Sequence, residues 1–521
     1  MRDMLEFDFI IVGAGSAGSV LAHHLTEDPH ATVLVVEAGG TQIPEQVDNT
    51  AQWYLLWGTP VDWDYPTVPQ AGLNNRVLRE PRGKLLGGSS NLYIMQHVRG
   101  HSSDYDHWSY ASTPGWCYAD VLPYFQRLED QEDESSPWAG HGGPLSVINA
   151  HLHQPNPTSQ VFLDACHERG YPFTADFNGP TMEGAGWYHL NIKDGKRHSA
   201  ARAYLLPAID RTNLTVATHA QVTKLLFEGT RCIGVAYVQN DMLLTARARH
   251  EVILAAGAIE SPKLLLLSGI GRPDHLQPFD IPVLVDVLGV GENLHDHPLG
   301  YVTYQAAQPI PPPQLNLSES ALFWHSNPGW LGPDLQLSCA QGSLDFLLAQ
   351  SHPNTLSILC GVVRPLARGW VRLASADPLA KPLVNPEYLN NAADLDRMVQ
   401  AMKRARELFA TSAFSSWTTT ELRPGPDIQC DDELRAFTRQ QVMPYWHLCG
   451  SCKMGLDRQA VVDPHLRVHG VEGLRVVDAS VMPSIPSGNI HTAVLMIAER
   501  ASDLIKDTYA LKKTPSFQEA T

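Results

Sequence analysis

The segment Phe7-Asp8-Phe9-Ile10-Ile11-Val12-Gly13-Ala14-Gly15-Ser16-Ala17-Gly18 decides the fold of this chain. Its first half is apolar, aromatic or β-branched for the most part and predicts a short strand, and residues 19–25 continue with helical apolar spacing. A second predicted strand covers residues 32–36 and ends at Glu37. A G-x-G-x-x-G sequence between strand and helix, with an acid at the end of the next strand, is the fingerprint of a dinucleotide-binding βαβ unit.

Each glycine of this fingerprint has its own physical task. Gly13 allows the tight turn, Gly15 lets the backbone approach a pyrophosphate, and Gly18 lets the helix pack close to the strand. Free amides at the start of the helix supply partial positive charge to the pyrophosphate. The carboxylate of Glu37 can accept hydrogen bonds from the hydroxyls of an adenosine ribose, and it would repel a 2′-phosphate. The sequence therefore disfavours NADP.

The bulk properties of the chain narrow its class. A length of 521 residues is too great for one ordinary core, so we expect two intertwined or sequential domains. A formal charge of −17 argues against nucleic acid and anionic membrane surfaces as partners. No apolar run reaches the roughly 18–20 residues of a membrane span, the N-terminus leaves no room for a signal peptide, and the 8 cysteines are not spaced as a disulfide framework. These features predict a cytoplasmic protein with reduced thiols.

Apolar periodicity predicts further strands and helices beyond the fingerprint. An aromatic segment at 53–65 has no clear period and is expected to cover part of the site, and a glycine-rich turn follows at 81–90. A helix is expected from Gly257, and the apolar stripe of a second helix at 395–409 predicts core packing. Strands are predicted at 214–218, 221–227, 232–238, 251–256, 335–338, 370–373 and 474–477, and further helices at 104–108, 118–128 and 490–506.

Four ordered blocks make the chain similar to the glucose–methanol–choline (GMC) flavoprotein oxidoreductases, over about residues 7–506. The first block is the fingerprint with Glu37. The others are 81–100, which begins Pro-Arg-Gly-Lys and ends Arg-Gly; 257–271; and a C-terminal pair at 445–455 and 477–491. The resemblance implies FAD and an α/β fold, in which a Rossmann-like FAD-binding domain is combined with a discontinuous α+β substrate domain. It assigns 1–150, 191–298 and 456–521 to the FAD-binding domain, and 151–190 and 299–455 to the substrate domain.

The same resemblance implies the residues that would hold FAD. Glu37 would bind the adenosine ribose and Val222 the adenine through its backbone, while 87–94 would lie along the flavin and pyrophosphate. The segment 478–479 would lie at the pyrophosphate and ribityl end, and 489–490 at the pyrimidine edge. The complete expected set is Gly13, Gly15, Ser16, Ala17, Gly18, Glu37, Ala38, Gly87, Gly88, Asn91, Leu92, Tyr93, Ile94, Val222, Trp446, Asp478, Ala479, Asn489 and Ile490.

Two positions depart from the family pattern at the flavin face. Tyr93 stands where the family usually has asparagine and where aryl-alcohol oxidases have histidine, and we do not expect Asn91, two residues earlier, to replace it. Leu92 stands where members with a covalently tethered flavin have histidine. Leucine cannot form that bond, so we expect FAD to be bound non-covalently.

Two histidines are the expected catalytic residues. Oxidation of an alcohol requires removal of the hydroxyl proton and of a hydride from the same carbon, and flavin N5 can take the hydride. A neutral imidazole suits the proton, since its unperturbed pKa lies near neutrality. By resemblance, His447 is the base that takes the proton, and His491, at the start of the last helix, orients the alcohol oxygen.

Two other groups of reactive side chains are expected to be structural. The pair Cys449 and Cys452 has the spacing of a redox or metal motif, but no second pair accompanies it, so we expect packing. His295, Asp296 and His297 could suggest a metal, yet they lie in a segment similar to the loop after the family's second signature. We therefore expect a structural or flavin-adjacent role and no metal site.

The sequence thus predicts FAD-dependent oxidation of a primary alcohol to an aldehyde, with oxygen or another acceptor as second substrate. One alternative is a lyase on the same scaffold, which cleaves cyanohydrins or decarboxylates fatty acids in light; another is a flavin-binding protein without turnover. The substrate cavity is expected to draw its lining from about 301–444, where no carboxylate and aromatic cage for a cationic substrate can be recognised. Substrate identity, electron acceptor and oligomeric state stay open at this point.

Overall fold

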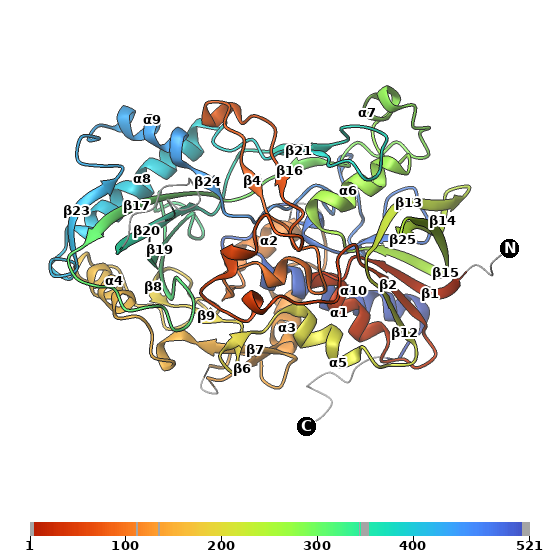
Figure 1. Ribbon diagram of the computed structural model, residues 1–521, viewed down its shortest axis with the longest axis horizontal. Helices are drawn as coiled ribbons and strands as arrows, with labels where there is room; N and C mark the ends of the chain where they lie inside the picture. Colours follow the sequence, from red (N-terminus) through yellow and green to blue (C-terminus); the bar gives the residue numbers. More distant parts are fainter. Residues whose placement is uncertain (1–4, 111–112, 134–135, 343, 345–353, 513–521) are drawn as a thin grey trace.

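The molecule is built on two separate β-sheets, one at each end of its long axis (Figure 1). This computed structural model describes residues 5–110, 113–133, 136–342, 344 and 354–512. The sheet that holds both the first strand and the last strand of the chain lies on the right in Figure 1, and the second sheet lies on the left.

The first sheet is parallel where it carries the fingerprint. Its strands, in spatial order, are β12 (Leu214–Ala217), β2 (Val33–Val36), β1 (Leu5–Val12), β15 (Met242–Leu254), β14 (Arg231–Gln239) and β13 (Ala220–Glu228), with β25 (Leu474–Val476) beside the end of β15. β12, β2, β1 and β25 run parallel to their neighbours, whereas β13, β14 and the first half of β15 form an antiparallel meander. Val12 pairs with both Val36 and Leu254, so three strands end at one edge of the sheet.

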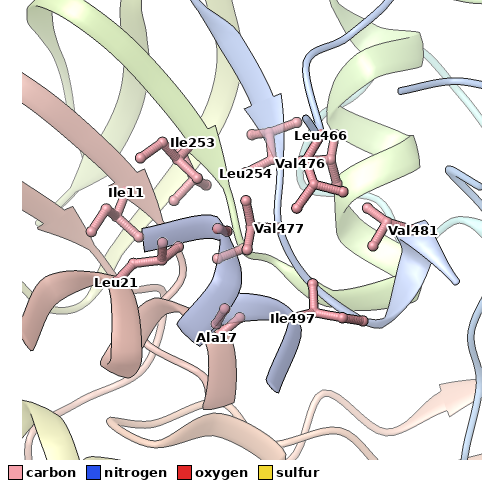
Figure 2. Close-up of a cluster of buried hydrophobic side chains, with 14 of the residues drawn as sticks. Ile11, Ala17, Leu21, Ile253, Leu254, Leu466, Val476, Val477, Val481 and Ile497 are labelled. Carbon is pink, nitrogen blue, oxygen red and sulfur yellow. The ribbon is translucent and has the colours of Figure 1, made fainter. Parts of the chain in front are cut away.

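Two helices from opposite ends of the chain pack together against this sheet. They are α1 (Ser16–Leu25) and α10 (His491–Tyr509). Figure 2 shows their meeting point, where Ala17 and Leu21 of α1 and Ile497 of α10 lie below the strand residues Ile11 and Ile253. These side chains are almost fully buried, so the first and last segments of the chain share one hydrophobic core.

The second sheet is antiparallel and is backed by a long helix. Its strands are β23 (Thr418–Arg423), β17 (Pro298–Ala306), β20 (Thr355–Val362), β19 (Leu335–Gln341), β18 (Ser320–Trp324) and β8 (Gly184–Trp187), and β24 (Met443–Pro444) pairs with β17. Helix α8 (Ala392–Phe409) packs on β17, β19 and β20 with the apolar stripe predicted for core packing. Its buried apolar residues are Leu395, Met398, Val399, Ala401, Met402, Ala405, Leu408 and Phe409.

Shorter elements connect and cover the two sheets. The remaining helices are α2 (Ser102–Tyr110), α3 (Tyr118–Leu128), α4 (Pro157–Glu168), α5 (Leu206–Ala208), α6 (Gly257–Leu267), α7 (Pro273–Leu276) and α9 (Asp431–Gln441). The small sheets comprise β5 (Gln96–His97), β9 (His189–Leu190), β7 (Leu145–Asn149) and β6 (Glu129–Gln131); β16 (Glu292–Leu294), β21 (Gly369–Arg372) and β22 (Leu383–Asn385); β3 (Tyr65–Pro66) and β4 (Arg79–Glu80); and β10 (Ile192–Lys193) and β11 (Lys196–Arg197). None of the described helices combines the length and apolarity of a membrane span.

Most of the predicted elements are confirmed. The helix predicted at 118–128 coincides with α3, and the strand predicted at 251–256 is the end of the longer β15. The first half of β15 is paired within the meander and alternates polar and apolar residues, whereas its end, residues 252–254, is buried and apolar. Because the two parts have different patterns, the sequence predicted only the buried end as a strand. The division of the chain into five domain segments stays a prediction.

A close approach at Gly18 generates a stability prediction. A Cβ at Gly18 would lie 1.9 Å from the carbonyl oxygen of Gly13, whereas a Cβ at Gly15 would find its nearest neighbour 4.0 Å away. We therefore expect Gly18→Ala to lower the free energy of unfolding by about 1–3 kcal/mol, because the added methyl group forces the backbone at Gly13 to move. Gly15→Ala should change it by only about 0.5 kcal/mol. Equilibrium urea unfolding of both variants in ligand-free form tests this, and equal stability of the two would contradict it.

Candidate active site

A cavity opens where β1, β2 and β15 end. Together with its mouth it encloses about 1330 Å³. The turn at Gly13 and Gly15 forms one wall, the segment after β15 another, and the start of α10 a third. The carboxyl ends of neighbouring parallel strands are the usual position of a ligand site in an open α/β sheet.

Glu37 connects the fingerprint turn to the end of β2. Its two carboxylate oxygens accept hydrogen bonds from the backbone N–H groups of Ala14 and Gly39, both at 2.8 Å. Burial raises the pKa of Glu37, and these two amides act in the opposite direction. Each carboxylate oxygen has a second lone pair, so both can still accept from a ribose hydroxyl.

Asp478 connects the C-terminal segment to the start of α6. Its carboxylate accepts from the N–H of Gly257 at 2.9 Å, from the hydroxyl of Ser261 at 2.6 Å and from the N–H of Ser480 at 2.8 Å. These bonds fix residues 478–479 at the edge of the cavity, on the same side as the end of β15.

Most of the residues expected to hold FAD surround this cavity. Those that line it are Gly13, Gly15, Ser16, Ala17, Glu37, Ala38, Gly88, Tyr93, Val222, Trp446, Asp478, Ala479, Asn489 and Ile490, together with His447 and His491. Leu92 and Ile94 line a second cavity instead. Gly18 and Gly87 are not part of either wall, and neither is Asn91, whose amide donates to the carbonyls of Leu86 and Gly88 within its own turn.

The second cavity adjoins the first and has an apolar, aromatic wall. With its mouth it encloses about 910 Å³. Its aromatic residues are Trp53, Trp57, Tyr93, Tyr445 and Trp446; its other side chains include Leu299, Leu317, Ala340, Leu344 and Leu359. The two cavities share the residues Arg82, Ser89, Tyr93, Trp446, His447 and Asn489, so His447 lies where they meet. As expected, part of this wall comes from 301–444, and the tryptophans at 53 and 57 complete it.

Hydrogen bonds fix the orientation of the His447 ring. Its Nδ1 lies 3.0 Å from Nδ1 of His297, and its Nε2 lies 3.4 Å from Nδ2 of Asn489. The Asn489 amide is oriented by Gln336, whose Nε2 donates to its Oδ1 at 3.4 Å. Because the amide N–H points at Nε2 of His447, that nitrogen is the acceptor and Nδ1 carries the hydrogen. The lone pair of His447 is therefore on Nε2, where the Asn489 amide contacts it at 3.4 Å.

His491 is held differently, by packing. It is buried, and neither ring nitrogen has a hydrogen-bond partner among the described residues. The ring of Tyr93 packs on it with centroids 4.5 Å apart, and the Tyr93 hydroxyl donates away from it to Oδ1 of Asn191 at 2.8 Å. Both nitrogens of His491 are thus available to a ligand in the first cavity.

All three histidines at this junction are kept neutral. Burial lowers the pKa of His447 well below its ordinary value, and the neighbouring His297 and Arg82 lower it further. Burial also lowers the pKa of His297 to about 3 and that of His491 to about 3. The site therefore holds neutral imidazoles over the whole physiological pH range.

Comparisons with known proteins show the family of this chain. Sequence models of the GMC oxidoreductase family match residues 7–299 and residues 365–498. The chain belongs to the GMC oxidoreductase family. It is 39% identical to mitochondrial choline dehydrogenase of Mus musculus, over 99% of this chain and 92% of that protein, and 39% identical to oxygen-dependent choline dehydrogenase of Brucella ovis, over 96% of each. Among solved structures, pyridoxine 4-oxidase from Mesorbium loti superposes with a TM-score of 0.91 at 36% identity, over 95% of this chain and 98% of that one.

This GMC oxidoreductase is an FAD-dependent enzyme that acts on CH–OH groups. The residues of the first cavity fit FAD. The Gly15 backbone is open to a pyrophosphate, Glu37 has free lone pairs for a ribose, and both nitrogens of His491 are buried without a partner beside the site of the flavin. The start of α10, directly after Asn489 and Ile490, directs a helix N-terminus at the same region.

Sequence reasoning missed several residues of the cavity wall. They are Val12, Val36, Arg82, Gly83, Ala220, Gln221, Ala255, Ala256, Gly257, Ala258, Ile259, Glu260, Leu264, Leu448 and Val494. The segment 255–260 could have been found, because it follows a buried strand that pairs in parallel with β1. Nothing local marks Arg82 as a residue shared by both cavities.

The open backbone at Gly15 generates a binding prediction for the GMC enzyme. A methyl group at this position projects toward the cavity at the point of pyrophosphate approach and contacts little protein. We expect Gly15→Ala to weaken FAD binding by about tenfold or more, which is about 1.4 kcal/mol, with the fold intact. Titration of flavin-free protein with FAD, followed by quenching of flavin fluorescence, measures this. Wild-type affinity in the variant would contradict it.

Proposed function

We propose that this GMC oxidoreductase converts a primary alcohol to an aldehyde, with His447 taking the hydroxyl proton and His491 orienting the alcohol oxygen. The observation that carries the proposal is the location of His447, whose unprotonated Nε2 lies at the junction of the cofactor cavity and the second cavity. FAD, when bound, supplies the acceptor for the hydride at its N5 position.

The protein residues contribute orientation and a proton acceptor. His447 can accept a proton at Nε2 in place of its 3.4 Å contact with Asn489, while its Nδ1–H remains bonded to His297, so the ring need not turn during the transfer. His491 can donate from one nitrogen to the alcohol oxygen, since neither nitrogen is used by the protein. Leu92 cannot form a covalent bond to a flavin, which supports non-covalent FAD.

The second cavity supports an alcohol with an apolar or aromatic body. Most of the described residues that line it have aromatic or aliphatic side chains. Arg82 is the charged residue among them, and they include no aspartate or glutamate. Curated relatives are named choline dehydrogenases and a solved relative is named pyridoxine 4-oxidase. A substrate panel should therefore contain benzylic, aliphatic, pyridine-ring and choline-type alcohols.

Anaerobic addition of the panel alcohols discriminates oxidation from the alternatives. Bleaching of the bound flavin by an alcohol, with aldehyde as product, supports the proposal. Product formed without bleaching would indicate a lyase, and no response to any alcohol would indicate a flavin-binding protein without turnover. Repeating the reaction with oxygen and with an artificial dye identifies the electron acceptor.

Removal of the proposed base is the direct test of the mechanism. We expect His447→Ala to lower the rate of anaerobic flavin reduction by about 10²–10⁴-fold, because the hydroxyl proton then has no acceptor. Bound FAD should be retained, since His447 is one of many residues that line the cavity. Stopped-flow absorbance measures the rate, and the exposed His153, replaced by alanine, serves as the matched control. A wild-type rate in His447→Ala would exclude this mechanism.

The low pKa of the buried histidines generates a pH prediction. A base whose pKa is lowered stays unprotonated until the pH falls to that lowered pKa, so acid inactivation should begin below the ordinary histidine pKa of 6.5. We expect the ring of His447 itself to stay unprotonated between about pH 7.5 and about pH 5.5, which the ring resonances of histidine-labelled protein report directly. A His447 ring resonance that titrates with a midpoint near 6.5 would contradict this.

A further inference from the structure

A second polar cluster lies directly behind His447, outside both cavity walls except for Arg82. It consists of Glu80, Asp296, Tyr388 and Arg82, from segments far apart in the sequence. Glu80 is 0%, Tyr388 2% and Asp296 3% exposed. Two buried carboxyl groups thus lie beside one partly exposed guanidinium, whose side chain is 17% exposed.

The hydroxyl of Tyr388 lies between the two carboxyl groups. It is 2.7 Å from Oε1 of Glu80 and in close contact with Oδ2 of Asp296. Burial and the two carboxyls raise the pKa of Tyr388 well above its ordinary value, so the phenol keeps its hydrogen. One phenol hydrogen can serve only one of the two carboxyls, and the other contact needs a hydrogen that the carboxyl itself supplies.

The surroundings indicate which carboxyl is neutral. Asp296 also accepts from the backbone N–H of His447 at 2.7 Å, a bond that favours its ionised form. Burial raises the pKa of Asp296 to about 6 and that of Glu80 to about 8. At neutral pH, Glu80 is therefore the acid and Asp296 the carboxylate, and the hydrogen bonds run from Glu80 to Tyr388 to Asp296.

Charge balance agrees with a single proton on the two carboxyl groups. Arg82 lies 3.3 Å from Oε2 of Glu80 and lowers the pKa of both carboxyls. One guanidinium and one carboxylate leave the cluster neutral, whereas two carboxylates would leave a buried net negative charge. The other titratable groups that face Asp296 are His297 and His447, which are neutral, and Cys449, whose thiol pKa burial raises well above its ordinary value.

We propose that Glu80, Tyr388 and Asp296 share one proton and act as a positioning unit for His447. The unit accepts a hydrogen bond from the backbone N–H of His447, so the His447 ring remains available for the reaction. Deprotonation of Glu80 leaves two carboxylates on either side of one phenol hydrogen, and their repulsion displaces Asp296 from the backbone N–H of His447. The base then loses its fixed position, so the enzyme is switched off at alkaline pH. This inference rests on the proposed function only where it concerns catalysis; the shared proton stands on the geometry alone.

The rate arm of the test compares four variants by anaerobic stopped-flow flavin reduction over about pH 6–10. Wild type should show an alkaline limb with a midpoint of about 8, because Glu80 loses its proton as the pH rises through that value. Glu80→Gln, which mimics the neutral acid, should keep the neutral-pH rate within about threefold and lose the limb. Asp296→Asn should lower the rate by about 100-fold with little change in the Kd of the alcohol, and Tyr388→Phe by about tenfold.

Tyr304→Phe is the matched control. Its hydroxyl donates to Glu421 at 3.0 Å beside Arg406, so this variant removes a tyrosine–glutamate bond of the same kind in the substrate-domain sheet. It should leave both the rate and the alkaline limb unchanged. A wild-type limb in Glu80→Gln, or wild-type rates in both Asp296→Asn and Tyr388→Phe, would overturn the proposal.

A second arm needs no alcohol and separates this inference from the proposed function. The infrared difference spectrum of wild-type holoenzyme between neutral and alkaline pH should contain the C=O band of a neutral carboxylic acid, and Glu80→Gln should lack it. In histidine-labelled protein, the His447 amide resonance, identified by its loss in His447→Asn, should titrate with the same midpoint in wild type and stay fixed in Glu80→Gln. Absence of the band from wild type, or a His447 resonance that does not respond, would overturn the shared proton even if alcohols reduce the flavin.

Discussion

The parallel pairing of β15 with β1 on one side and β25 on the other is the interaction on which the site depends. It brings Val12, Leu254 and Val476 to the same edge of the sheet, although they are separated by hundreds of residues in the chain. Each strand then continues into a segment that lines the cavity: the fingerprint turn after β1, the start of α6 after β15, and Asp478 after β25. The buried apolar side chains shared by α1 and α10 hold this edge together, so burial of hydrophobic surface positions polar groups that make few contacts of their own.

A second constraint is the cost of charge inside this site. The ring of His491 is buried and that of His447 lies between the two cavities, and no carboxylate among the described residues contacts the nitrogens of either ring, so a protonated ring there would be an unbalanced cation. Neutral imidazoles avoid that cost. The same constraint acts on the carboxyls behind His447, where only one negative charge can be balanced by Arg82. The neutral histidine rings and the proton shared by Glu80, Tyr388 and Asp296 therefore both follow from the cost of an unbalanced charge inside the protein.

The sequence predicted the parts of this structure that depend on local pattern. The fingerprint, the strand-to-Glu37 spacing and the stripe of α8 are short-range signals of turn geometry and periodicity, and the elements that they predicted are observed. The wall of the second cavity and the cluster around Tyr388 could not be predicted in this way. They join side chains from distant loops, and their spacing in the chain has no period that reflects their spacing in the fold.

Tyr93 illustrates how a departure from a family pattern is resolved by packing. From the sequence, Asn91 is not expected to replace the usual asparagine, and in the structure its amide donates to the carbonyls of Leu86 and Gly88 within its own turn. The ring of Tyr93 covers His491, while its hydroxyl is tied to Asn191 on the far side. The ring contact holds His491 in place, and neither of its nitrogens forms a hydrogen bond with the described residues. His447 is oriented through hydrogen bonds and His491 through an aromatic contact. In the proposed reaction the base would therefore exchange its contact with Asn489 for the alcohol hydroxyl, whereas His491, whose nitrogens have no partner among the described residues, would gain its first hydrogen bond.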